Sequence, residues 1–247
     1  MEFAGKVAIV TGASRGIGRA VAEMLAERGA SLVLVGMDRA RIGAVAGEIG
    51  RGTVSVAGDV ARAETARAAV DAAVATFGTL DILANIAGAF PTALLQDTSD
   101  EQFAQSIATN LQGTFAFCRA ALPVMRGQGG AAIVNMSSMA ARFPTPGLSV
   151  YGASKAGVEA FSRSIAAEVA PEVRVNVVAA GPTATETVRA LIEADTTGAT
   201  AAVTKSLPLG RLAKPREIAE VVLFLASDRA SCMTGQVVHA NCGGLMP

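Results

Sequence analysis

The chain has no tryptophan, a single histidine and only three cysteines among its 247 residues. With His239 as the one imidazole, the sequence argues against a zinc site and against a histidine-based catalytic triad. The cysteines (Cys118, Cys232 and Cys242) are odd in number and lack metal-ligand spacing. We therefore expect no metal site and reduced thiols in a cytoplasmic protein.

Net charge and long hydrophobic runs are also missing. Lysine and arginine number 21, as do aspartate and glutamate, and no basic run occurs. Electrostatics thus offers no reason to expect nucleic acid or an anionic membrane as a partner. The longest apolar stretches, such as residues 221–226, are far too short to cross a membrane, and the first residues do not resemble a targeting segment.

What the chain does have is a regular alternation of short apolar runs with amphipathic segments. The strand-like runs are 7–10, 32–35, 53–57, 80–84, 132–136 and 173–178, and the helix-like segments are 15–28, 39–49, 62–77, 101–126, 151–169 and 215–226. Apolar strands separated by helices are typical of a parallel sheet covered on both faces. No change in composition divides residues 1–247, so we expect one domain. The widest irregular stretch, 180–210, is typical of a lid or binding loop.

A glycine-rich turn, Thr11-Gly-Ala-Ser-Arg-Gly-Ile-Gly18, joins the first strand to the first helix. Gly12 allows a tight turn, Gly16 lets the backbone approach a phosphate, and Gly18 lets the helix pack on the strand. The start of the helix presents unpaired N–H groups to an anion. An ordinary glycine-rich turn is the alternative, but the strand–turn–helix context favours a dinucleotide site.

Three side chains predict proton transfer. Tyr151 and Lys155 lie four residues apart, on one face of a helix, and Ser138 ends a buried strand thirteen residues upstream of Tyr151. Because an ammonium favours a nearby phenolate, Lys155 is expected to lower the pKa of Tyr151 from ~10 and so fit it for acid–base work. Ser138 can donate to a substrate oxygen as that atom becomes negative. Each residue alone could be structural, as a core aromatic, a solvated charge and a helix cap.

These features appear together, in one order, in a known family. The landmarks are the spacing Gly-x-x-x-Gly-x-Gly, Asp59-Val60, Asn85-Ile-Ala-Gly88, Asn110, Ser138, Tyr151, Lys155, Gly181-Pro-Thr183 and Gly243-Gly244. Over essentially its whole length the chain resembles the classical subgroup of the short-chain dehydrogenase/reductase family. The resemblance implies a single-domain α/β Rossmann fold, with a doubly wound parallel sheet of about seven strands in the order 3-2-1-4-5-6-7. It also implies NAD(P)-dependent hydride transfer between a nicotinamide and a carbonyl or secondary alcohol.

The resemblance assigns roles to individual residues. It implies catalytic roles for Asn110, Ser138, Tyr151 and Lys155. Tyr151 would be the general acid/base, and Asn110 would loosen its own helix and hold a water in a proton relay to Lys155. The implied cofactor-binding residues are Gly12, Ser14, Arg15, Gly16, Ile17, Gly18, Met37, Asp38, Asp59, Val60, Asn85, Ala87, Gly88, Tyr151, Lys155, Gly181, Thr183 and Thr185.

Within that set, Asp59 would accept from the adenine amino group, while Thr183 and Thr185 would reach the carboxamide. A turn or capping role for Asp59 and a plain loop role for Thr185 are the alternatives. Three positions depart from the common family pattern: Ile86, Ala180 and the pair Asn241-Cys242. None removes a group that the hydride step needs, although the last could alter the packing of the C-terminus.

Cofactor choice depends on residues 36–39, which read Gly-Met-Asp-Arg. Many NAD-type members carry an acid at position 36 or 37, and many NADP-type members carry an arginine at position 37; this chain has neither. Arg15 resembles NADP-preferring members, whereas Asp38 argues the other way. The resemblance therefore favours NADP(H) over NAD(H).

The candidate substrate pocket is mostly apolar. It consists of Phe90, Pro91, Met139, Ala140, Phe143, Pro144, Leu148 and the loop 183–206. Such residues suit an apolar or alicyclic ketone or alcohol, or an acyl thioester, so a carbonyl reductase or alcohol dehydrogenase is the first hypothesis.

The commonest activity implied by the resemblance is that of a 3-oxoacyl-(acyl-carrier-protein) reductase of fatty-acid or polyketide synthesis. Docking of an acidic carrier would need a basic rim, but residues 127–130 (Gly-Gln-Gly-Gly) and Pro171-Glu172 are expected there, so this hypothesis ranks second. A non-catalytic dinucleotide-binding regulator ranks third, because Ser138, Tyr151 and Lys155 are all present. Family members usually form tetramers or dimers through the helices that contain Asn110 and Tyr151, so a homotetramer or homodimer is expected.

Overall fold

The computed structural model of the chain describes residues 1–127 and 129–246. The predictions that involve Gln128, part of the expected rim, and Pro247, the end of the expected domain, lie outside the described residues.

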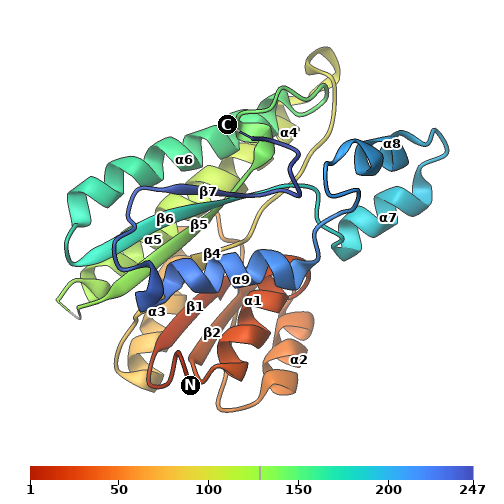
Figure 1. Cartoon of the computed structure of the whole chain (residues 1–247). Coiled ribbons are helices and arrows are strands. Elements are labelled where there is room, and N and C mark those ends of the chain that lie inside the picture. Colours follow the sequence, from red (N-terminus) through yellow and green to blue (C-terminus); the bar gives the residue numbers. More distant parts are fainter. Residues whose placement is uncertain (128, 247) are drawn as a thin grey trace.

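Seven parallel strands in the described part of the chain form one twisted sheet with the order β3-β2-β1-β4-β5-β6-β7 (Figure 1). The strands are β1 (Val7–Thr11), β2 (Ser31–Gly36), β3 (Val54–Ala57), β4 (Ile82–Asn85), β5 (Ala131–Ser138), β6 (Val173–Ala180) and β7 (Val237–Ala240). The order reverses between β1 and β4, as in a doubly wound sheet of Rossmann type. The predicted fold class and strand order are therefore confirmed.

Helices cover both faces of this sheet (Figure 1). They are α1 (Gly16–Glu27), α2 (Arg39–Ile49), α3 (Ala63–Phe77), α4 (Asp100–Ser106), α5 (Gly113–Met125), α6 (Ser149–Val169), α7 (Glu186–Ala194), α8 (Ala199–Ser206) and α9 (Pro215–Ala226). Side chains of α1, α2 and α9 form a core with one face of the sheet. Side chains of α3, α5 and α6 form a second core with the other face. Because β1 and β5 are buried on both faces, their sequences are mostly apolar, and the polar residues Asn135 and Ser137 of β5 are buried with hydrogen-bond partners.

The helix predicted over 101–126 is interrupted. Between α4 and α5 the backbone forms a π-helical segment, Ile107–Gln112, with the buried Asn110 inside it. Ser99 caps α4 through its side chain, in a capping box with Gln102. The helical path is therefore continuous in space but wider around Asn110, and such widenings occur often at functional sites.

The stretch 180–210, predicted to be irregular, contains α7 and α8. Thr185 begins α7 by accepting a hydrogen bond from Val188 N–H through its side chain. Of the α7 residues that the structure describes, none is buried, and in Figure 1 both helices lie to one side of the sheet. The sequence analysis missed both helices, although apolar residues of α7 gather on one side of the helix.

Candidate active site

The glycine turn has the geometry that close approach of a ligand requires. Gly12 and Gly16 have φ of +67° and +56°, which L side chains rarely adopt. A Cβ on Gly18 would overlap the carbonyl oxygen of Gly12, so only glycine lets α1 pack on the turn after β1 here. Among the described residues no side chain caps the start of α1, where Arg15 is extended and exposed and Ser14 is half-buried. The free N–H groups of this turn fit a pyrophosphate.

The end of β2 borders the same turn. Met37 is exposed, and the Asp38 carboxylate accepts a hydrogen bond from Arg41 N–H at 3.0 Å, which caps α2. Asp38 thus has a structural role that accounts for an acid at this position. Arg41 also reaches across to α7, where its guanidinium lies 2.7 Å from Glu186.

After β3 and β4, two predicted cofactor residues have their side chains engaged by the protein. Asp59 Oδ1 accepts from Ala61 N–H at 2.9 Å, which is the turn role weighed as its alternative. Asn85 Nδ2 donates to Asn135 Oδ1 at 2.9 Å in the interior, so this amide nitrogen is engaged within the protein. Val60 is buried against Gly113 at the start of α5.

The loop after β4 links the glycine turn to the catalytic side chains. A Cβ on Gly12 would lie 2.8 Å from Ala87 Cα, so the two loops are in contact. A Cβ on Gly88 would lie 3.1 Å from Asn110 Oδ1 and 3.4 Å from Lys155 Nζ. The loop after β4 therefore contacts the predicted phosphate-binding turn through Ala87 and the predicted catalytic Lys155 through Gly88.

Asn110 holds that loop to α6. Its Oδ1 accepts from Ala89 N–H at 2.9 Å, while its Nδ2 donates to the Ala89 carbonyl and to Ser154 Oγ, both at 3.0 Å. The side-chain amide of Asn110 is thus used to join three elements. A water held by this residue would need its backbone carbonyl, which already accepts from Thr114 Oγ1 and has a second lone pair.

Ser138, Tyr151 and Lys155 meet where β5 ends against the start of α6. Lys155 is 3% exposed, and its Nζ donates to the Met136 carbonyl at 2.9 Å. Ser138 Oγ accepts from Ala140 N–H at 3.2 Å. The ring of Phe90 lies edge-on to that of the half-buried Tyr151, with centroids 4.7 Å apart and planes at 83°.

The electrostatics of Tyr151 differ from the sequence prediction. Burial raises the pKa of the phenol above its ordinary value, and hydrogen bonding with Ser138 offsets part of that rise. Burial also lowers the pKa of Lys155 to about 8. The prediction that Lys155 lowers the pKa of Tyr151 is wrong for the protein alone, because Lys155 Nζ lies 5.9 Å from the ring centre and bonds to Met136 instead.

The loop after β6 closes the site from the other side. A Cβ on Gly16 would lie 3.2 Å from Thr185 Cγ2, so this loop packs on the glycine turn. The Thr183 hydroxyl donates to the Gly181 carbonyl at 2.9 Å, and Thr185 Oγ1 caps α7. Gly181 in turn packs against Asn241, which organises the C-terminal turn by accepting from Gly243 N–H at 3.0 Å.

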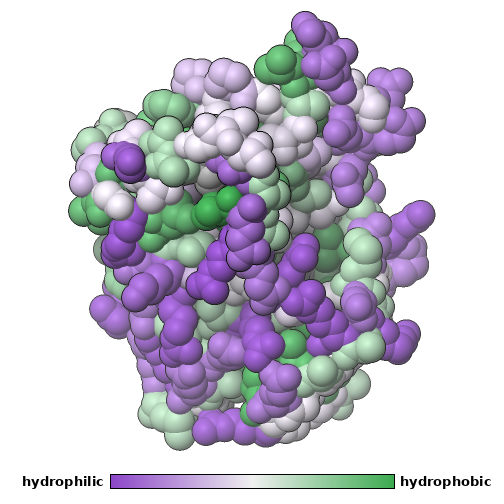
Figure 2. Space-filling model, turned by 90° about the vertical axis from the view of Figure 1, so that its right-hand side faces the viewer, coloured by the Kyte–Doolittle hydropathy of each residue, from purple (hydrophilic) through white to green (hydrophobic). Residues whose placement is uncertain are grey.

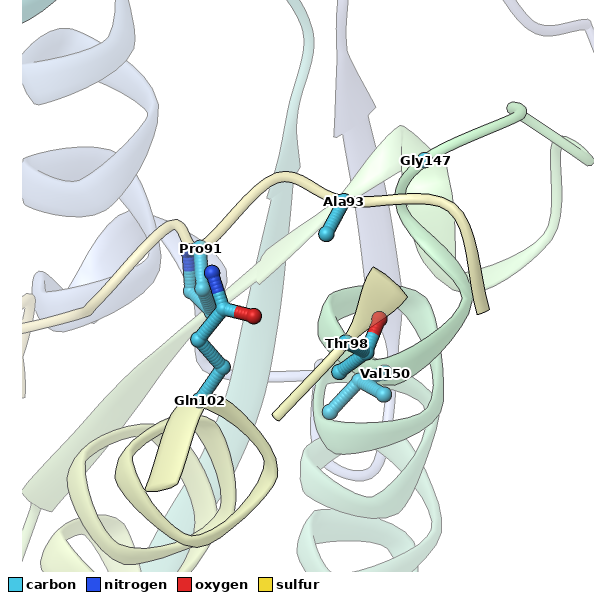
Figure 3. Close-up of a pocket in the computed structure, with 6 residues that line it drawn as sticks. All are labelled: Pro91, Ala93, Thr98, Gln102, Gly147 and Val150. Carbon is cyan, nitrogen blue, oxygen red and sulfur yellow. The ribbon is translucent and has the colours of Figure 1, made fainter. Parts of the chain in front are cut away.

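Two hollows border the first turns of α6, and Tyr151 lines neither of them. Figure 3 shows the smaller one, between the loop of Pro91 and Ala93, Gln102 of α4, and the start of α6; its volume of about 10 Å³ suits a single water. A more open hollow of about 270 Å³ lies between the turn after Ser138 and α6. The candidate pocket residues Ala140, Phe143, Pro144 and Leu148 line it.

The face that includes α7 and α8 is chemically mixed. Figure 2 shows it with hydrophilic residues separating several smaller hydrophobic patches. Leu191, Ile192 and Val203 are exposed on the two helices. Among the described residues, no group of three or more His, Cys, Asp or Glu could hold a metal ion, and no helix is long and apolar enough to cross a membrane.

The predicted rim segments lie elsewhere in the molecule. The described residues of the first segment, Gly127, Gly129 and Gly130, precede β5, and Pro171-Glu172 precede β6. They therefore lie at the amino ends of the strands, whereas Ser138 is at a carboxyl end. Arg126 and Glu172 pair there, with Nε and Oε2 3.6 Å apart. The prediction that these segments form the rim is wrong, and their lack of positive charge does not bear on docking at the cleft.

Known proteins share this arrangement over the whole chain. A family profile described as enoyl-(acyl carrier protein) reductase matches residues 12–244. The 3-oxoacyl-(acyl-carrier-protein) reductase FabG of Vibrio cholerae is 39% identical over 247 residues, which covers 100% of both chains. A solved structure described as a short chain dehydrogenase/reductase family protein has a TM-score of 0.88 at 39% identity and covers 99% of each chain. The chain belongs to the short-chain dehydrogenase/reductase family.

A further solved structure agrees with this assignment. The short-chain dehydrogenase/reductase from Brucella melitensis described as glucose/ribitol dehydrogenase has a TM-score of 0.93 at 34% identity, covering 100% of this chain and 99% of that one. Membership makes the chain an oxidoreductase that uses a nicotinamide cofactor and acts on a carbonyl or secondary alcohol. The predicted family and reaction class are confirmed.

Sequence reasoning missed residues that hold the site together without touching a ligand. Thr11 Oγ1 accepts from Ile86 and Ala87 N–H groups at 3.0 and 3.1 Å and so attaches the loop after β4 to β1. Ser154, which bonds Asn110, lies between Tyr151 and Lys155 in the sequence Tyr-Gly-Ala-Ser-Lys. The sequence signal that could have identified Ser154 is its position on the inward face of α6.

Proposed function

We propose that the chain reduces an apolar ketone, with Tyr151 giving a proton to the substrate oxygen, Ser138 donating a hydrogen bond to that oxygen, and Lys155 fixing the cofactor and supporting the phenol. The observation that carries this proposal is the convergence of the three side chains where β5 meets α6, next to the glycine turn. A nicotinamide held by these residues would supply the hydride for the carbonyl carbon, or would accept it in the reverse direction.

The proton balance favours reduction. Burial keeps the Tyr151 phenol protonated near neutrality, so the phenol can act as a proton donor. In reduction its O–H bond breaks and the proton passes to the oxygen of the substrate, where the hydroxyl of Ser138 stabilises developing negative charge. Lys155, with its ammonium anchored to Met136, faces the phenolate that results and is placed to return a proton through a water held by Asn110.

The fit of a dinucleotide rests on the residues around the glycine turn. Gly12, Ser14, Arg15, Gly16, Ile17 and Gly18 would hold the pyrophosphate; Asp59 and Val60 the adenine; Asn85, Ala87, Gly88, Gly181, Thr183 and Thr185 the nicotinamide half. The open start of α1 and the missing side chains at Gly12 and Gly16 support this assignment.

Within the cofactor class we propose a preference for NADP(H). Asp38 is engaged in capping α2, and Met37 offers no carboxylate to repel a 2′-phosphate. The exposed guanidinium of Arg15, in the adjacent turn, supplies the positive charge that such a phosphate needs.

A second candidate is reduction of a 3-oxoacyl group on an acyl-carrier protein. The full-length identity of 38–39% to FabG of Escherichia coli and Vibrio cholerae favours it. Both candidates use the same three side chains, and they differ in whether a carrier is needed to present the carbonyl.

A cofactor and substrate screen tests these proposals. Purified enzyme is mixed with NADPH or NADH and either small cyclic and aliphatic ketones or 3-oxoacyl thioesters, and oxidation of the nicotinamide is followed by absorbance. Turnover of free ketones supports the first candidate, while turnover only of carrier-bound thioesters supports the second. Tight NADPH binding with no turnover across the panel would instead indicate a non-catalytic regulator.

We also propose one domain over residues 1–247, a substrate loop at 183–206, and a cytoplasmic homotetramer or homodimer that joins through the helices of Asn110 and Tyr151. The exposed Phe103 and Phe115 on α4 and α5 support such an interface. Free thiols at Cys118, Cys232 and Cys242 agree with a reducing compartment. Sedimentation that gives a monomer at micromolar concentration would contradict the proposed assembly.

A further inference from the structure

A buried carboxylate lies beside the site, and the proposed mechanism does not use it. Glu159 is 3% exposed and lies on α6, one helical turn beyond Lys155 and two beyond Tyr151. A buried carboxylate is costly unless it is paired and hydrogen-bonded. Its partners therefore indicate what this residue holds in place.

Arg163, one turn further along α6, lies 3.9 Å from Glu159 Oε2, and the hydrogen-bond partners of the carboxylate flank Ser138. Glu159 Oε1 accepts a hydrogen bond from Ser137 Oγ at 3.1 Å, and Oε2 accepts from Arg142 Nε at 3.1 Å. Ser137 is the residue before Ser138, and Arg142 directly follows the 3₁₀ turn Met139–Ala141. One carboxylate thus binds residues on both sides of Ser138.

Further contacts attach the same segment to α6. Ser137 Oγ also lies 3.2 Å from the carbonyl oxygen of Lys155, and Lys155 Nζ donates to Met136. A Cβ on Gly152 would lie 2.6 Å from the carbonyl oxygen of Ala140, so turn and helix are in direct backbone contact. Glu159 is the member of this set that reaches both ends of the turn.

We propose that Glu159 is a positioning residue, whose carboxylate holds the backbone on both sides of Ser138 against the helix that carries Tyr151 and Lys155. The inference rests on the proposed function, since it concerns the separation between the Ser138 hydroxyl and the Tyr151 phenol. Both groups must reach one substrate oxygen, and a displacement of roughly 1 Å at such a site can cost about 100-fold in rate.

A purely stabilising ion pair is the competing explanation, and the chain offers a matched control. Asp81 is also buried and joins two segments, accepting from Val7 N–H at 2.9 Å and from Lys6 Nζ at 3.1 Å. It lies just before β4, at the amino edge of the sheet, away from Ser138. Asp81→Asn therefore reports what losing a buried paired carboxylate does to the fold alone.

The test compares Glu159→Gln, Ser137→Ala and Asp81→Asn for thermal stability, kcat, KM and NADPH affinity. We expect Glu159→Gln and Ser137→Ala to lower kcat at least about tenfold while NADPH affinity stays within about twofold. Asp81→Asn should lose stability and keep kcat. If kcat stays within about twofold of wild type in both site variants, or falls equally in Asp81→Asn, the positioning role is overturned.

A spectroscopic readout works without turnover. Ser137→Ala changes no charge, so a rise in the Tyr151 pKa, measured by tyrosinate absorbance, supports loosening of Ser138; an unchanged value counts against it. Ser137→Ala also keeps the test open if Glu159→Gln fails to fold. Tyr151→Phe separates the two proposals. If it turns over normally, the proposed function fails. If Tyr151→Phe is inactive while both Glu159→Gln and Ser137→Ala keep full activity, only the inference is overturned.

Discussion

Lys155 is anchored by the protein rather than by Tyr151: its ammonium donates to the Met136 carbonyl at 2.9 Å and lies 5.9 Å from the centre of the Tyr151 ring. Lys155 is buried and Tyr151 is half-buried, and loss of solvent favours the neutral form of each, which raises the pKa of Tyr151 and lowers that of Lys155 to about 8. The pair is therefore a preformed site whose protonation a bound cofactor can still change.

Ionisation of Tyr151 can be measured directly, because the chain has one tyrosine and no tryptophan. Tyrosinate absorbance should give a pKa above ~10 in the free protein, since burial outweighs the hydrogen bond from Ser138. Ser138→Ala should raise this pKa further, because it removes the contact that lowers it. A pKa below ~10 in the free wild-type protein would restore the sequence-based view that Lys155 controls the phenol.

Lys155→Met should make the protein more stable and inactive. Burial shifts the pKa of Lys155 from 10.5 to about 8, which costs the folded wild-type protein roughly 3 kcal/mol. The variant avoids this cost but loses the hydrogen bond to Met136, which contributes about 1 kcal/mol. We expect the free energy of unfolding in urea to rise by about 1–2 kcal/mol near pH 7.

The pH dependence of the stability gained by Lys155→Met tests whether burial of the charge causes it. The folded-state pKa is lowered, so the charge penalty is full below pH about 8 and vanishes above ~10.4, where the unfolded lysine is also neutral. The stability advantage of Lys155→Met should therefore shrink as pH rises from 8 toward 10.4. An advantage that is constant with pH would mean that burial of the charge is not its cause.

His239 on β7 should make the fold sensitive to mild acid. Neither ring nitrogen has a hydrogen-bond partner among the described residues, and burial, followed by the nearby Arg142, lowers the pKa of the imidazole, while Glu159 acts in the opposite direction. Since the folded pKa is depressed, stability is lost as pH falls below the unfolded value of ~6.5. As the pH falls below ~6.5, the melting temperature of wild type should decrease more than that of His239→Gln. At pH 8 the two melting temperatures should be equal.

Met37→Asp should reverse the proposed cofactor preference. A carboxylate at the end of β2 binds a 2′-hydroxyl and repels a 2′-phosphate. We expect the ratio of kcat/KM for NADPH over NADH to fall by about tenfold or more, which corresponds to about 1.4 kcal/mol. Arg15→Ala should lower the same ratio by removing the phosphate partner. If neither variant changes the ratio, the 2′-phosphate is recognised by other residues.

Most of the fold was predictable because strands buried on both faces leave an unambiguous apolar pattern, as in β1 and β5. The ends of β5 and β6 were harder to predict. Both strands extend to small residues, Ser138 and Ala180, which still pair across the sheet. Helices α7 and α8 were missed because they lie outside the core.

The chemistry of the site followed from residue types and spacing, but its supporting contacts did not. Asp38, Asp59 and Thr185 each use a side-chain oxygen locally, in caps and a turn that short sequence patterns do not distinguish from ligand contacts. The raised pKa of Tyr151 depends on burial, which only the packed structure reveals.

The measurement that tests the account most directly is single-turnover oxidation of NADPH by wild type and Tyr151→Phe, with a ketone found active in the screen. General acid catalysis typically contributes about 10²–10⁴-fold, so the variant should transfer hydride slower by that factor while binding NADPH within about threefold of wild type. A Tyr151→Phe enzyme that transfers hydride at close to the wild-type rate would contradict the assignment of this phenol as the proton donor.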